Sequence, residues 1–352
     1  MKKIIIYGGS FDPFHKGHLN SAKIALWKLK ADTIYFVPSY TSELKNSSST
    51  STWKQRYEML KLELQKYKKF KISNWNIKNK NLYSINLVNY FLKKFPNSKL
   101  YLLIGSDQVN NLHNWKNANE LCNLITIICV KRPNIKLNKF NVTKFKINII
   151  GDSKINASST KLRQVSNKKY LSKAIINYIN NNCLYSEERI KRFLSTKRWE
   201  HCKRTALMAK QIAIKNNYKN FHEAYIAGLF HDLAKEFNKK KLMYYTNLLG
   251  IKSFTSIQTL HPYVAYYFMK YYYLFNNNRI LRAVYRHTEP IQKKLSKLDK
   301  IIYVADKCES GRIKQQDKLP YNVKRIQKMA KKNINLAFNE LFKILTKYFE
   351  KK

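Results

Sequence analysis

The sequence is poor in cysteine and has no long apolar run. Its five cysteines are scattered over 352 residues without a CxxC pair, which excludes a disulfide framework and favours reduced thiols in the cytoplasm. No stretch approaches the roughly 18 uncharged apolar residues of a membrane span. The apolar start at residues 1–7 is too short for a signal peptide and is followed at once by glycines. We therefore expect a cytoplasmic protein without membrane contact.

Acidic residues are also scarce: 21 stand against 68 lysines and arginines, so the formal net charge is +47. A charge of this size can attract nucleic acid, because clustered cations release counterions when they bind phosphates. The lysines are spread along the whole chain, however, and asparagine, isoleucine and tyrosine are abundant with them. We interpret the charge mainly as compositional drift that also suits anionic nucleotide substrates.

Apolar residues make up 44% of the chain, which is enough for real cores, and the length fits two domains. In the first half, short β-rich runs alternate with helical patterns, which predicts βαβ units and a parallel sheet. The predicted strands are Lys3–Tyr7, Thr33–Pro38, Phe70–Ile77, Lys99–Ile104, Leu124–Val130 and Lys146–Ile150, and the predicted helices are Leu19–Lys30, Trp53–Tyr67 and Ile85–Phe95.

The character of the sequence changes after about residue 185. No alternating strand pattern follows, and helical patterns dominate at Ser186–Leu194, His201–Asn216, Phe221–Leu233, Pro262–Tyr273, Ile280–His287 and Val323–Phe349. The sequence thus predicts an α/β domain with a doubly wound parallel sheet over residues 1–185, followed by an all-α domain over residues 186–352.

The segment GGSFDPFHKGH, Gly8–His18, follows the first predicted strand and precedes a helix. Glycines there let the backbone approach a phosphate, and ligands of open parallel sheets bind where the strands end. His15 and His18 are three residues apart at a helix start, so both can reach one anion. As hydrogen-bond donors they would stabilise the charge that develops in phosphoryl transfer. Further along, Ser158, Ser159 and Thr160 are predicted to cap a helix and offer their hydroxyls to a phosphate.

These segments resemble the signature of the nucleotidylyltransferase superfamily, and the form with Phe11-Asp12-Pro13 is similar to bacterial nicotinate-nucleotide adenylyltransferases. The resemblance implies attack by the 5′-phosphate of nicotinate mononucleotide on the α-phosphorus of ATP, with Mg²⁺ on the triphosphate and pyrophosphate leaving. It implies catalytic roles for His15, His18 and Arg163. It implies nucleotide-binding roles for Gly8, Gly9, Ser10, Phe11, Lys45, Gly105, Asp107, Trp115, Arg132, Ser158, Ser159 and Thr160.

One region departs from that family. Lys45 and Arg56 match its basic positions, but the segment NLYSINLVNYF, residues 81–91, keeps only Tyr83 and Ser84 of the family's pattern for the pyridine mononucleotide. The acceptor is therefore open, and phosphopantetheine and nicotinamide mononucleotide are alternatives.

The helical half contains an ordered set of histidines and aspartates. Imidazole and carboxylate are good ligands for iron, manganese and related divalent ions, and a bundle core can bring such ligands together from different helices. An adjacent His-Asp pair lets the aspartate bridge two metals, and a two-metal cluster can supply hydroxide for attack on a phosphate. The candidate ligands are His201, His231, Asp232, His261, His287 and Asp306.

This order resembles the HD-domain metallohydrolases, and most closely the bacterial HD proteins that cleave diadenosine tetraphosphate into two ADP. The resemblance implies two divalent metals, with iron expected, and a role for Lys235 in binding phosphate or orienting the nucleophile. Two positions depart from the family, at Arg286–Pro290 and at Lys307, which stands where a tyrosine is common.

The two motifs together predict a bifunctional enzyme that acts on ATP, nicotinate mononucleotide and diadenosine tetraphosphate. Two alternatives stay open. One is an adenylyltransferase for another acceptor, joined to an HD phosphohydrolase of different nucleotide specificity. The other, motivated by the charge of +47, is a non-enzymatic RNA-binding protein. The sequence predicts no oligomeric state.

Overall fold

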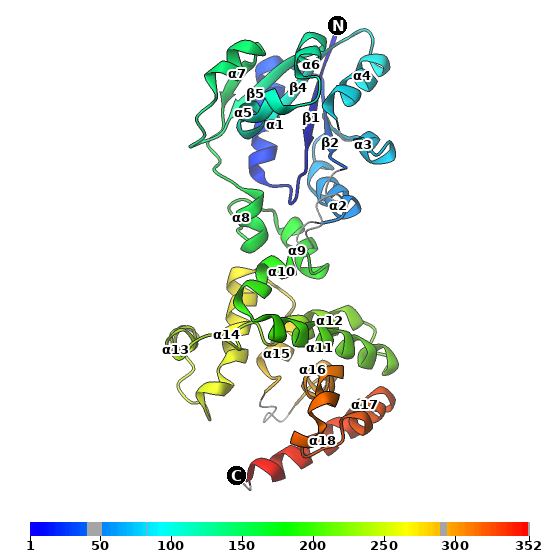
Figure 1. The fold of residues 1–352 in the computed structure, drawn as a ribbon, viewed down its shortest axis with the longest axis vertical. Helices are drawn as coiled ribbons and strands as arrows, with labels where there is room; N and C mark the ends of the chain where they lie inside the picture. Colours follow the sequence, from blue (N-terminus) through cyan, green and yellow to red (C-terminus); the bar gives the residue numbers. More distant parts are fainter. Residues whose placement is uncertain (41–50, 82, 289–293, 351–352) are drawn as a thin grey trace. The chain divides into compact units, whose positions relative to one another are not determined.

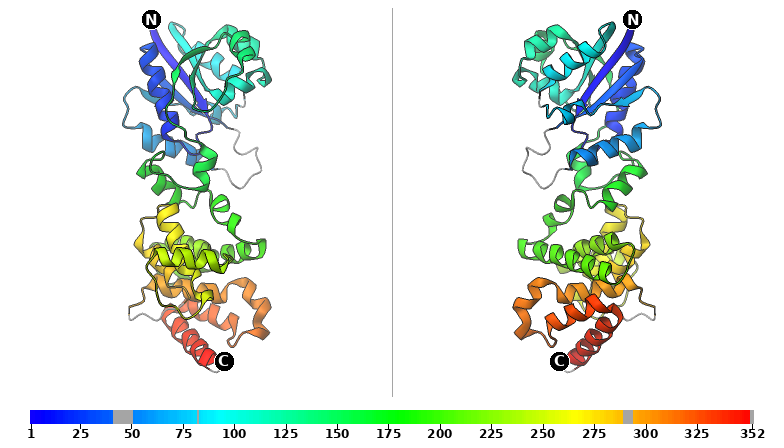
Figure 2. Two further views of the ribbon diagram at one scale, coloured as in Figure 1. Left: turned by 90° about the vertical axis from the view of Figure 1, so that its left-hand side faces the viewer. Right: turned by 90° about the vertical axis from the view of Figure 1, so that its right-hand side faces the viewer.

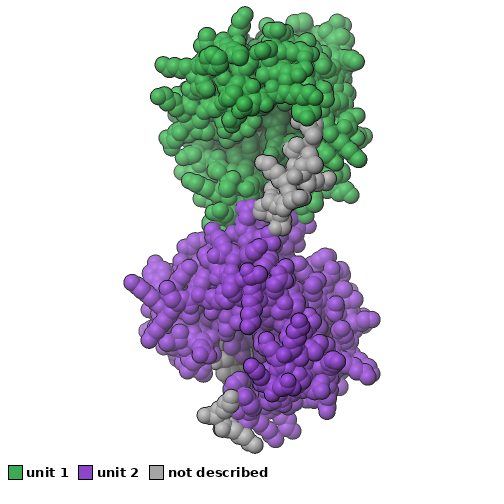
Figure 3. All heavy atoms as spheres, in the orientation of Figure 1, with its two compact units in different colours: residues 1–178 green, residues 179–352 purple. Residues whose placement is uncertain are grey.

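A computed structural model describes residues 1–40, 51–81, 83–288 and 294–350. The chain divides into two compact units, Met1–Tyr178 and Ile179–Lys352, which we call unit 1 and unit 2 (Figure 3). Each unit has its own buried apolar core. Among the described residues, no helix combines the length and the apolar character needed to cross a membrane.

Unit 1 is built on one parallel sheet of six strands in the order β3-β2-β1-β4-β5-β6 (Figure 1). The strands are β1 (Lys2–Gly9), β2 (Thr33–Pro38), β3 (Phe70–Ile72), β4 (Ser98–Gly105), β5 (Thr126–Lys131) and β6 (Asn148–Asp152). The predicted doubly wound α/β fold is confirmed. The predicted strand Phe70–Ile77 is wrong beyond Ile72, because Trp75–Lys78 forms a helical turn, α3.

Helices cover both faces of this sheet, which is seen from two further sides in Figure 2. Alternate strand residues such as Ile4, Ile6 and Leu102 pack in one cluster with residues of α4, α5 and α6, while α1 contacts β1, β2, β5 and β6. The remaining helices of unit 1 are α1 (Lys16–Leu29), α2 (Trp53–Leu64), α4 (Ser84–Lys94), α5 (Ser106–Asn111), η2 (Leu112–Asn114), α6 (Ala118–Leu124), α7 (Lys139–Lys144) and α8 (Ser159–Gln164), and α9 (Lys173–Asn181) spans the boundary.

The strand order places the candidate site. Strand β1 pairs with β2 on one side and with β4 on the other, so the chain winds outward in both directions from the β1–β4 pair. In sheets with this order, ligands usually bind where the loops that leave the carboxyl ends of these two strands diverge. The Gly8–His18 segment follows β1, and Gly105 ends β4.

Unit 2 is helical. Its elements are α10 (Ser186–Arg189), η3 (Lys191–Phe193), α11 (Thr196–Lys215), α12 (Phe221–Phe230), α13 (Lys239–Leu248), η4 (Ile257–Thr259), α14 (His261–Tyr267), η5 (Phe268–Tyr272), α15 (Asn278–Tyr285), α16 (Lys297–Cys308), η6 (Ser310–Lys318), α17 (Val323–Lys332) and α18 (Ile334–Glu350). The predicted single helix over 323–349 is wrong, because Asn333 takes an extended conformation (φ −151°, ψ 108°) and separates α17 from α18. The sequence prediction omits α9, α13 and α16; in α16 the continuous apolar run at 301–305 hides the helical period.

Helices α11 and α12 cross closely, and both carry candidate metal ligands. At the crossing, a Cβ on Gly228 would lie 2.8 Å from Cα and 3.0 Å from the backbone nitrogen of Ala206. Only a glycine allows this approach, which sets the spacing of the two helices.

Gly228→Ala should therefore lower the free energy of unfolding. Overpacking costs about 1–3 kcal/mol, and the better helix propensity of alanine offsets at most about 1 kcal/mol of this. Urea unfolding followed by circular dichroism measures the change. Leu207→Ala, at an exposed position of α11 (54% accessible), is the matched control and should shift the free energy by no more than about 0.5 kcal/mol. An unchanged midpoint for Gly228→Ala would contradict the role of this crossing.

Candidate functional site

In unit 1, His15 and His18 form a reciprocal cap at the start of α1. The Nδ1 atom of His15, the N-cap residue, accepts hydrogen bonds from the backbone N–H groups of Gly17 (3.1 Å) and His18 (3.4 Å). The Nδ1 atom of His18 accepts from the backbone N–H of His15 at 3.3 Å. The two rings stack with centroids 3.7 Å apart. Because both Nδ1 lone pairs are used, each neutral ring carries its proton on Nε2 and keeps one N–H donor.

Both imidazoles are held neutral. Burial, together with the nearby positive charge of Arg132, lowers the pKa of His15 to about 3. Burial, followed by the neighbouring His15 and by Arg132, also holds the pKa of His18 well below its usual value. The pair therefore offers two N–H donors without a positive charge at neutral pH. Such donors stabilise negative charge on a phosphoryl oxygen.

The glycine between the histidines is a steric requirement. A Cβ on Gly17 would lie 2.9 Å from both Nδ1 and Cε1 of His15. Any side chain there would displace the imidazole from its capping position. The H-x-G-H spacing thus follows from the geometry of the cap.

Helix α8 meets the same loop. Arg163 Nη1 donates to the Asp12 carbonyl at 3.0 Å, and Ser159 Oγ donates to the Pro13 carbonyl at 3.2 Å. The predicted capping by Ser158 is wrong, because Ser158 occupies the N-cap position of α8 but its side chain makes no capping hydrogen bond within the described chain. The structure nevertheless brings Arg163 and the serines beside the histidine loop.

The ends of β4 and β5 contribute Gly105, Asp107 and Arg132. Arg132 Nη1 lies 3.2 Å from Asp107 Oδ1, and its backbone N–H donates to Ser106 Oγ at 2.9 Å. A Cβ on Gly105 would lie 2.8 Å from Asp107 Oδ1, so the Asp107 side chain packs directly against the glycine backbone. Trp115 is half-buried against the core on the α4–α6 face.

Three other sequence-predicted positions have different outcomes. Arg56, matched to a basic family position, is fully buried and donates to the carbonyls of Ser10 (2.9 Å) and Ser39 (2.8 Å), so it fixes the loop after β1. Phe11 is buried, and its ring packs edge-on against His18 at a centroid distance of 5.1 Å. Lys45 lies outside the described residues.

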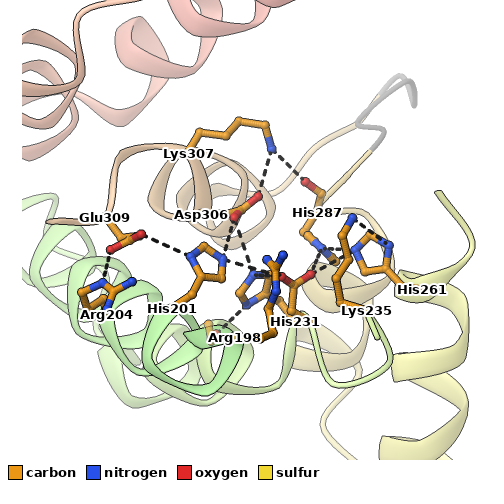
Figure 4. A network of polar contacts seen from close by, with 12 residues as sticks. Arg198, His201, Arg204, His231, Lys235, His261, His287, Asp306, Lys307 and Glu309 are labelled. Atoms are coloured by element: carbon orange, nitrogen blue, oxygen red, sulfur yellow. Dashed lines mark hydrogen bonds and ion pairs between the residues drawn. The ribbon is translucent and has the colours of Figure 1, made fainter. Parts of the chain in front are cut away.

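In unit 2, all six predicted metal ligands meet in the helical core (Figure 4). His201 comes from α11, His231 and Asp232 from the end of α12, His261 from the first position of α14, and His287 and Asp306 from the end of α15 and from α16 respectively. The four histidines and Asp232 are buried.

Asp232 divides the cluster into two groups. Its Oδ2 atom lies 3.6 Å from His201 Nε2 and 3.4 Å from His231 Nε2, and Asp306 Oδ1 is 3.1 Å from His201 Nε2. We call this set group A (His201, His231, Asp306 and Asp232 Oδ2). The other oxygen, Oδ1, lies 3.1 Å from His261 Nε2 and 3.6 Å from His287 Nε2. We call this set group B (His261, His287 and Asp232 Oδ1).

Every imidazole of the cluster turns its Nδ1 away from the centre and onto a hydrogen-bond acceptor. His231, His261 and His287 contact the backbone carbonyls of Gly228, Gln258 and Val284 at 2.7–2.8 Å, and His201 contacts Glu309 Oε1 at 3.2 Å. An Nδ1–H that donates outward leaves a lone pair on Nε2. All four Nε2 atoms therefore face the two aspartates and, in the neutral rings, would present lone pairs to a cation.

This arrangement fits divalent cations. Ligands about 2.1 Å from one ion at tetrahedral or octahedral angles lie roughly 3.0–3.4 Å apart, close to the separations in both groups. The Nε2 atoms of His201 and His231 are buried and make no hydrogen bond within the described chain. The Nε2 atoms of His261 and His287 face each other at 3.1 Å. These ring nitrogens would serve as ligands to a divalent ion placed between them.

The electrostatics favour ionised carboxylates. Burial raises the pKa of Asp232, but the facing imidazoles more than offset this and hold the pKa well below its usual value. Burial also lowers the pKa of His287 to about 4, so this ring stays neutral. Burial lowers the pKa of His231, but the charges and hydrogen bonds of Asp232 and Asp306 outweigh it and raise the pKa to about 10, so a divalent ion would displace that proton on binding Nε2.

A shell of charged side chains surrounds the ligands, and sequence reasoning missed most of it. Arg198 Nη1 lies 2.8 Å from Asp232 Oδ2, and Lys307 Nζ and Arg312 Nη2 each lie 3.3 Å from an oxygen of Asp306. The predicted Lys235 has its Nζ 3.5 Å from His261 Nδ1. The sequence signal that was available for Arg312 is its place at the end of the segment ESGR, residues 309–312, six residues after Asp306.

Comparison with known proteins agrees with both halves. Residues 6–165 match the cytidylyltransferase-like family, and residues 198–311 match the HD domain family. A relative from Mycoplasma genitalium, named "Probable nicotinate-nucleotide adenylyltransferase/Ap4A hydrolase", is 38% identical over 96% of each chain. One from Mycoplasma pneumoniae with the same name is 32% identical over 95% of this chain and 96% of its own.

The fold and the two sites define a nucleotidylyltransferase domain joined to a helical HD metallohydrolase domain. The chain belongs to the family of nicotinate-nucleotide adenylyltransferase/Ap4A hydrolase fusion proteins. A relative from Aliarcobacter butzleri named "Probable nicotinate-nucleotide adenylyltransferase" is 37% identical and matches 49% of this chain but 92% of its own.

The cap geometry predicts one tautomer for the two histidines of unit 1. In protein with ¹⁵N-labelled histidine, His15 and His18 should show the Nε2–H form, with no protonation between pH 5.5 and 8, because burial lowers the pKa of both rings. Two-dimensional NMR of the imidazole nitrogens measures this, with His15→Ala and His18→Ala assigning the signals. A titration step near pH 6.5 for either ring would refute the neutral pair.

The ligand cluster predicts that metal removal destabilises the protein. An ion held at 100 times its dissociation constant stabilises the fold by about 2.7 kcal/mol, so a chelator should lower the Tm by several degrees. Asp232→Ala removes both bridging oxygens and should abolish this response. Asp317→Ala, at an exposed position of unit 2, should respond to chelator as the unchanged protein does. Differential scanning calorimetry with and without chelator measures the change in Tm. A full decrease in the Tm of Asp232→Ala on addition of chelator would count against the cluster as the metal site.

Proposed function

We propose that the protein is a bifunctional cytoplasmic enzyme with one activity in each unit. Unit 1 transfers the adenylyl group of ATP to nicotinate mononucleotide, giving nicotinate adenine dinucleotide and pyrophosphate. Unit 2 hydrolyses diadenosine tetraphosphate symmetrically into two ADP. The predicted domain limits, 1–185 and 186–352, are part of this proposal. The likeness to the two mycoplasma proteins over 96% and 95% of the chain supports the pairing of activities.

The observation that carries the first activity is the stacked His15–His18 pair beside the carboxyl ends of β1 and β4. In the reaction a phosphate oxygen of the acceptor forms a bond to the α-phosphorus of ATP, and the bond to pyrophosphate breaks. No protein nucleophile is required, because positioning and charge stabilisation suffice. The two Nε2–H donors would hold phosphoryl oxygens, and Arg163 adds a cation next to the same loop. Bound Mg²⁺ would neutralise charge on the triphosphate.

The other nucleotide-binding assignments belong to this proposal. Gly8, Gly9 and Ser10 end β1 and leave backbone room for a phosphate. Gly105, Asp107 and Arg132 lie at the neighbouring strand ends, where the adenosine would bind. The remaining proposed contacts are Phe11, Lys45, Trp115, Ser158, Ser159 and Thr160.

The observation that carries the second activity is Asp232, whose two oxygens face separate sets of imidazoles. Groups A and B would hold two divalent ions, with iron as the proposed metal, and the ions would supply a hydroxide at neutral pH. Lys235, Arg198, Lys307 and Arg312 bring positive charge to the edge of the cluster. These cations would attract a polyphosphate chain, which carries several negative charges.

The test is product analysis with purified full-length protein. Incubation with ATP, Mg²⁺ and nicotinate mononucleotide should give nicotinate adenine dinucleotide, and incubation with diadenosine tetraphosphate and Fe²⁺ or Mn²⁺ should give ADP alone. Nicotinamide mononucleotide and phosphopantetheine are tested in parallel as acceptors. Turnover of either in place of nicotinate mononucleotide would correct the acceptor.

The two activities should separate by mutation. His18→Ala removes one donor to the phosphoryl group and should reduce dinucleotide formation by about 10²–10³-fold, with hydrolysis unchanged. His231→Ala removes a group A ligand and should abolish hydrolysis, with adenylyl transfer unchanged. Steady-state rates of both reactions for each variant provide the comparison. Loss of both activities in either variant would speak against independent sites.

A further inference from the structure

One ligand of the metal cluster has a different support from the other three. His231, His261 and His287 each direct Nδ1 to a neutral backbone carbonyl. His201 directs Nδ1 to the carboxylate of Glu309, at 3.2 Å. A carboxylate behind a metal-binding imidazole fixes its tautomer and makes its lone pair a stronger donor.

Glu309 is itself held rigidly. It is 2% exposed, and its second oxygen accepts hydrogen bonds from Arg204 Nε and from the backbone N–H of Gly311, both at 2.5 Å. Arg204 is thus the charged partner of this carboxylate, and both of its oxygens are occupied, one by His201 and the other by Arg204 and the Gly311 backbone.

The side chains around this carboxylate are closely packed. A Cβ on Gly311 would lie 2.6–2.9 Å from three atoms of the Arg204 guanidinium group, so the arginine lies directly against the glycine backbone. Figure 4 shows the resulting row, in which Arg204, Glu309 and His201 follow one another toward Asp306. The row runs from α11 through the turn after α16 and back to the metal ligand on α11.

The two metal positions are unequal in other ways. Group A offers four ligand atoms, including one carboxylate of its own, Asp306, and half of the shared Asp232. Group B offers three, with only the shared carboxylate. In group B the outward-facing Nδ1 of His261 lies 3.5 Å from the ammonium of Lys235. In group A the outward-facing Nδ1 of His201 contacts the carboxylate of Glu309.

We propose that Glu309 is a positioning residue that makes group A the tighter of the two metal positions, so that the centre fills in order, group A first. This inference rests on the proposed two-metal hydrolase centre and adds the rule by which that centre fills. Glu309 acts through His201 and contacts neither substrate nor metal. Its removal should change the affinity of one position selectively.

Metal titration of the full-length protein tests the proposal. Metal-free protein is titrated with Mn²⁺ by calorimetry, and two binding events with different dissociation constants are expected. Glu309→Gln keeps the size of the side chain and removes its charge. It should weaken the tighter event by about 10–100-fold, the usual effect of losing such a partner, and change the weaker event by less than about threefold. The readout is therefore the ratio of the two Mn²⁺ dissociation constants.

Two further variants keep the result interpretable. Arg204→Gln leaves Glu309 in place without its charged partner, and should weaken the same event by a smaller factor than Glu309→Gln. Glu340→Gln makes the same chemical change in α18, where Glu340 pairs with Arg325 at 3.2 Å, and should leave both constants unchanged.

The outcomes separate the inference from the function on which it rests. Equal weakening of both events in Glu309→Gln, or no weakening, overturns the positioning role while the two-metal centre stands. Fewer than two events in the unmutated protein overturns the two-metal centre itself. The titration uses no nucleotide, so a different hydrolase substrate would leave the result unaffected.

Discussion

The bridging carboxylate of Asp232 is the interaction on which the architecture of unit 2 depends. Its two oxygens face two sets of imidazole nitrogens inside an apolar core, and polar groups buried in this way are costly unless each has a partner. The four histidines lie on or directly beside α11, α12, α14 and α15, so these four helices must end or cross close to one another. The close α11–α12 crossing at Gly228 and the placement of His261 at the first position of α14 both serve this convergence. The helices thus bring the polar groups of a candidate metal site together inside an apolar core.

The histidines of the two sites use their ring nitrogens in opposite ways. In unit 1 the histidines use their Nδ1 atoms to cap a helix and keep Nε2–H donors, which suit the proposed anion. In unit 2 the histidines direct Nδ1 outward onto acceptors and turn Nε2 toward the aspartates, which suits the proposed cation. The same side chain therefore takes opposite tautomers, and the local backbone selects which one.

The sequence predicted much of this, and the reasons are specific. His15, Gly17 and His18 are close in sequence, so their cap is a local structure that spacing alone indicates. The six candidate metal ligands are distant in sequence, yet their order was distinctive enough to predict that they lie together. Glu309, Arg204 and Arg198 were missed, because a charged residue beside a ligand is ordinary in sequence and gains meaning only through packing. Arg56 was matched only to a basic family position, and the structure adds that it is buried and bonds backbone carbonyls.

The division of the chain has a consequence for the cell. The residues proposed for adenylyl transfer all lie within Met1–Tyr178, and the metal cluster with its supporting shell lies within Ile179–Lys352. One messenger RNA encodes both units, so each translated chain carries one centre of each kind. Separate promoters, separate degradation and unequal dosage, by which organisms usually adjust two enzymes, cannot act here. The ratio of the two catalysts is fixed at one to one by covalent linkage, and only their turnover rates remain to be tuned.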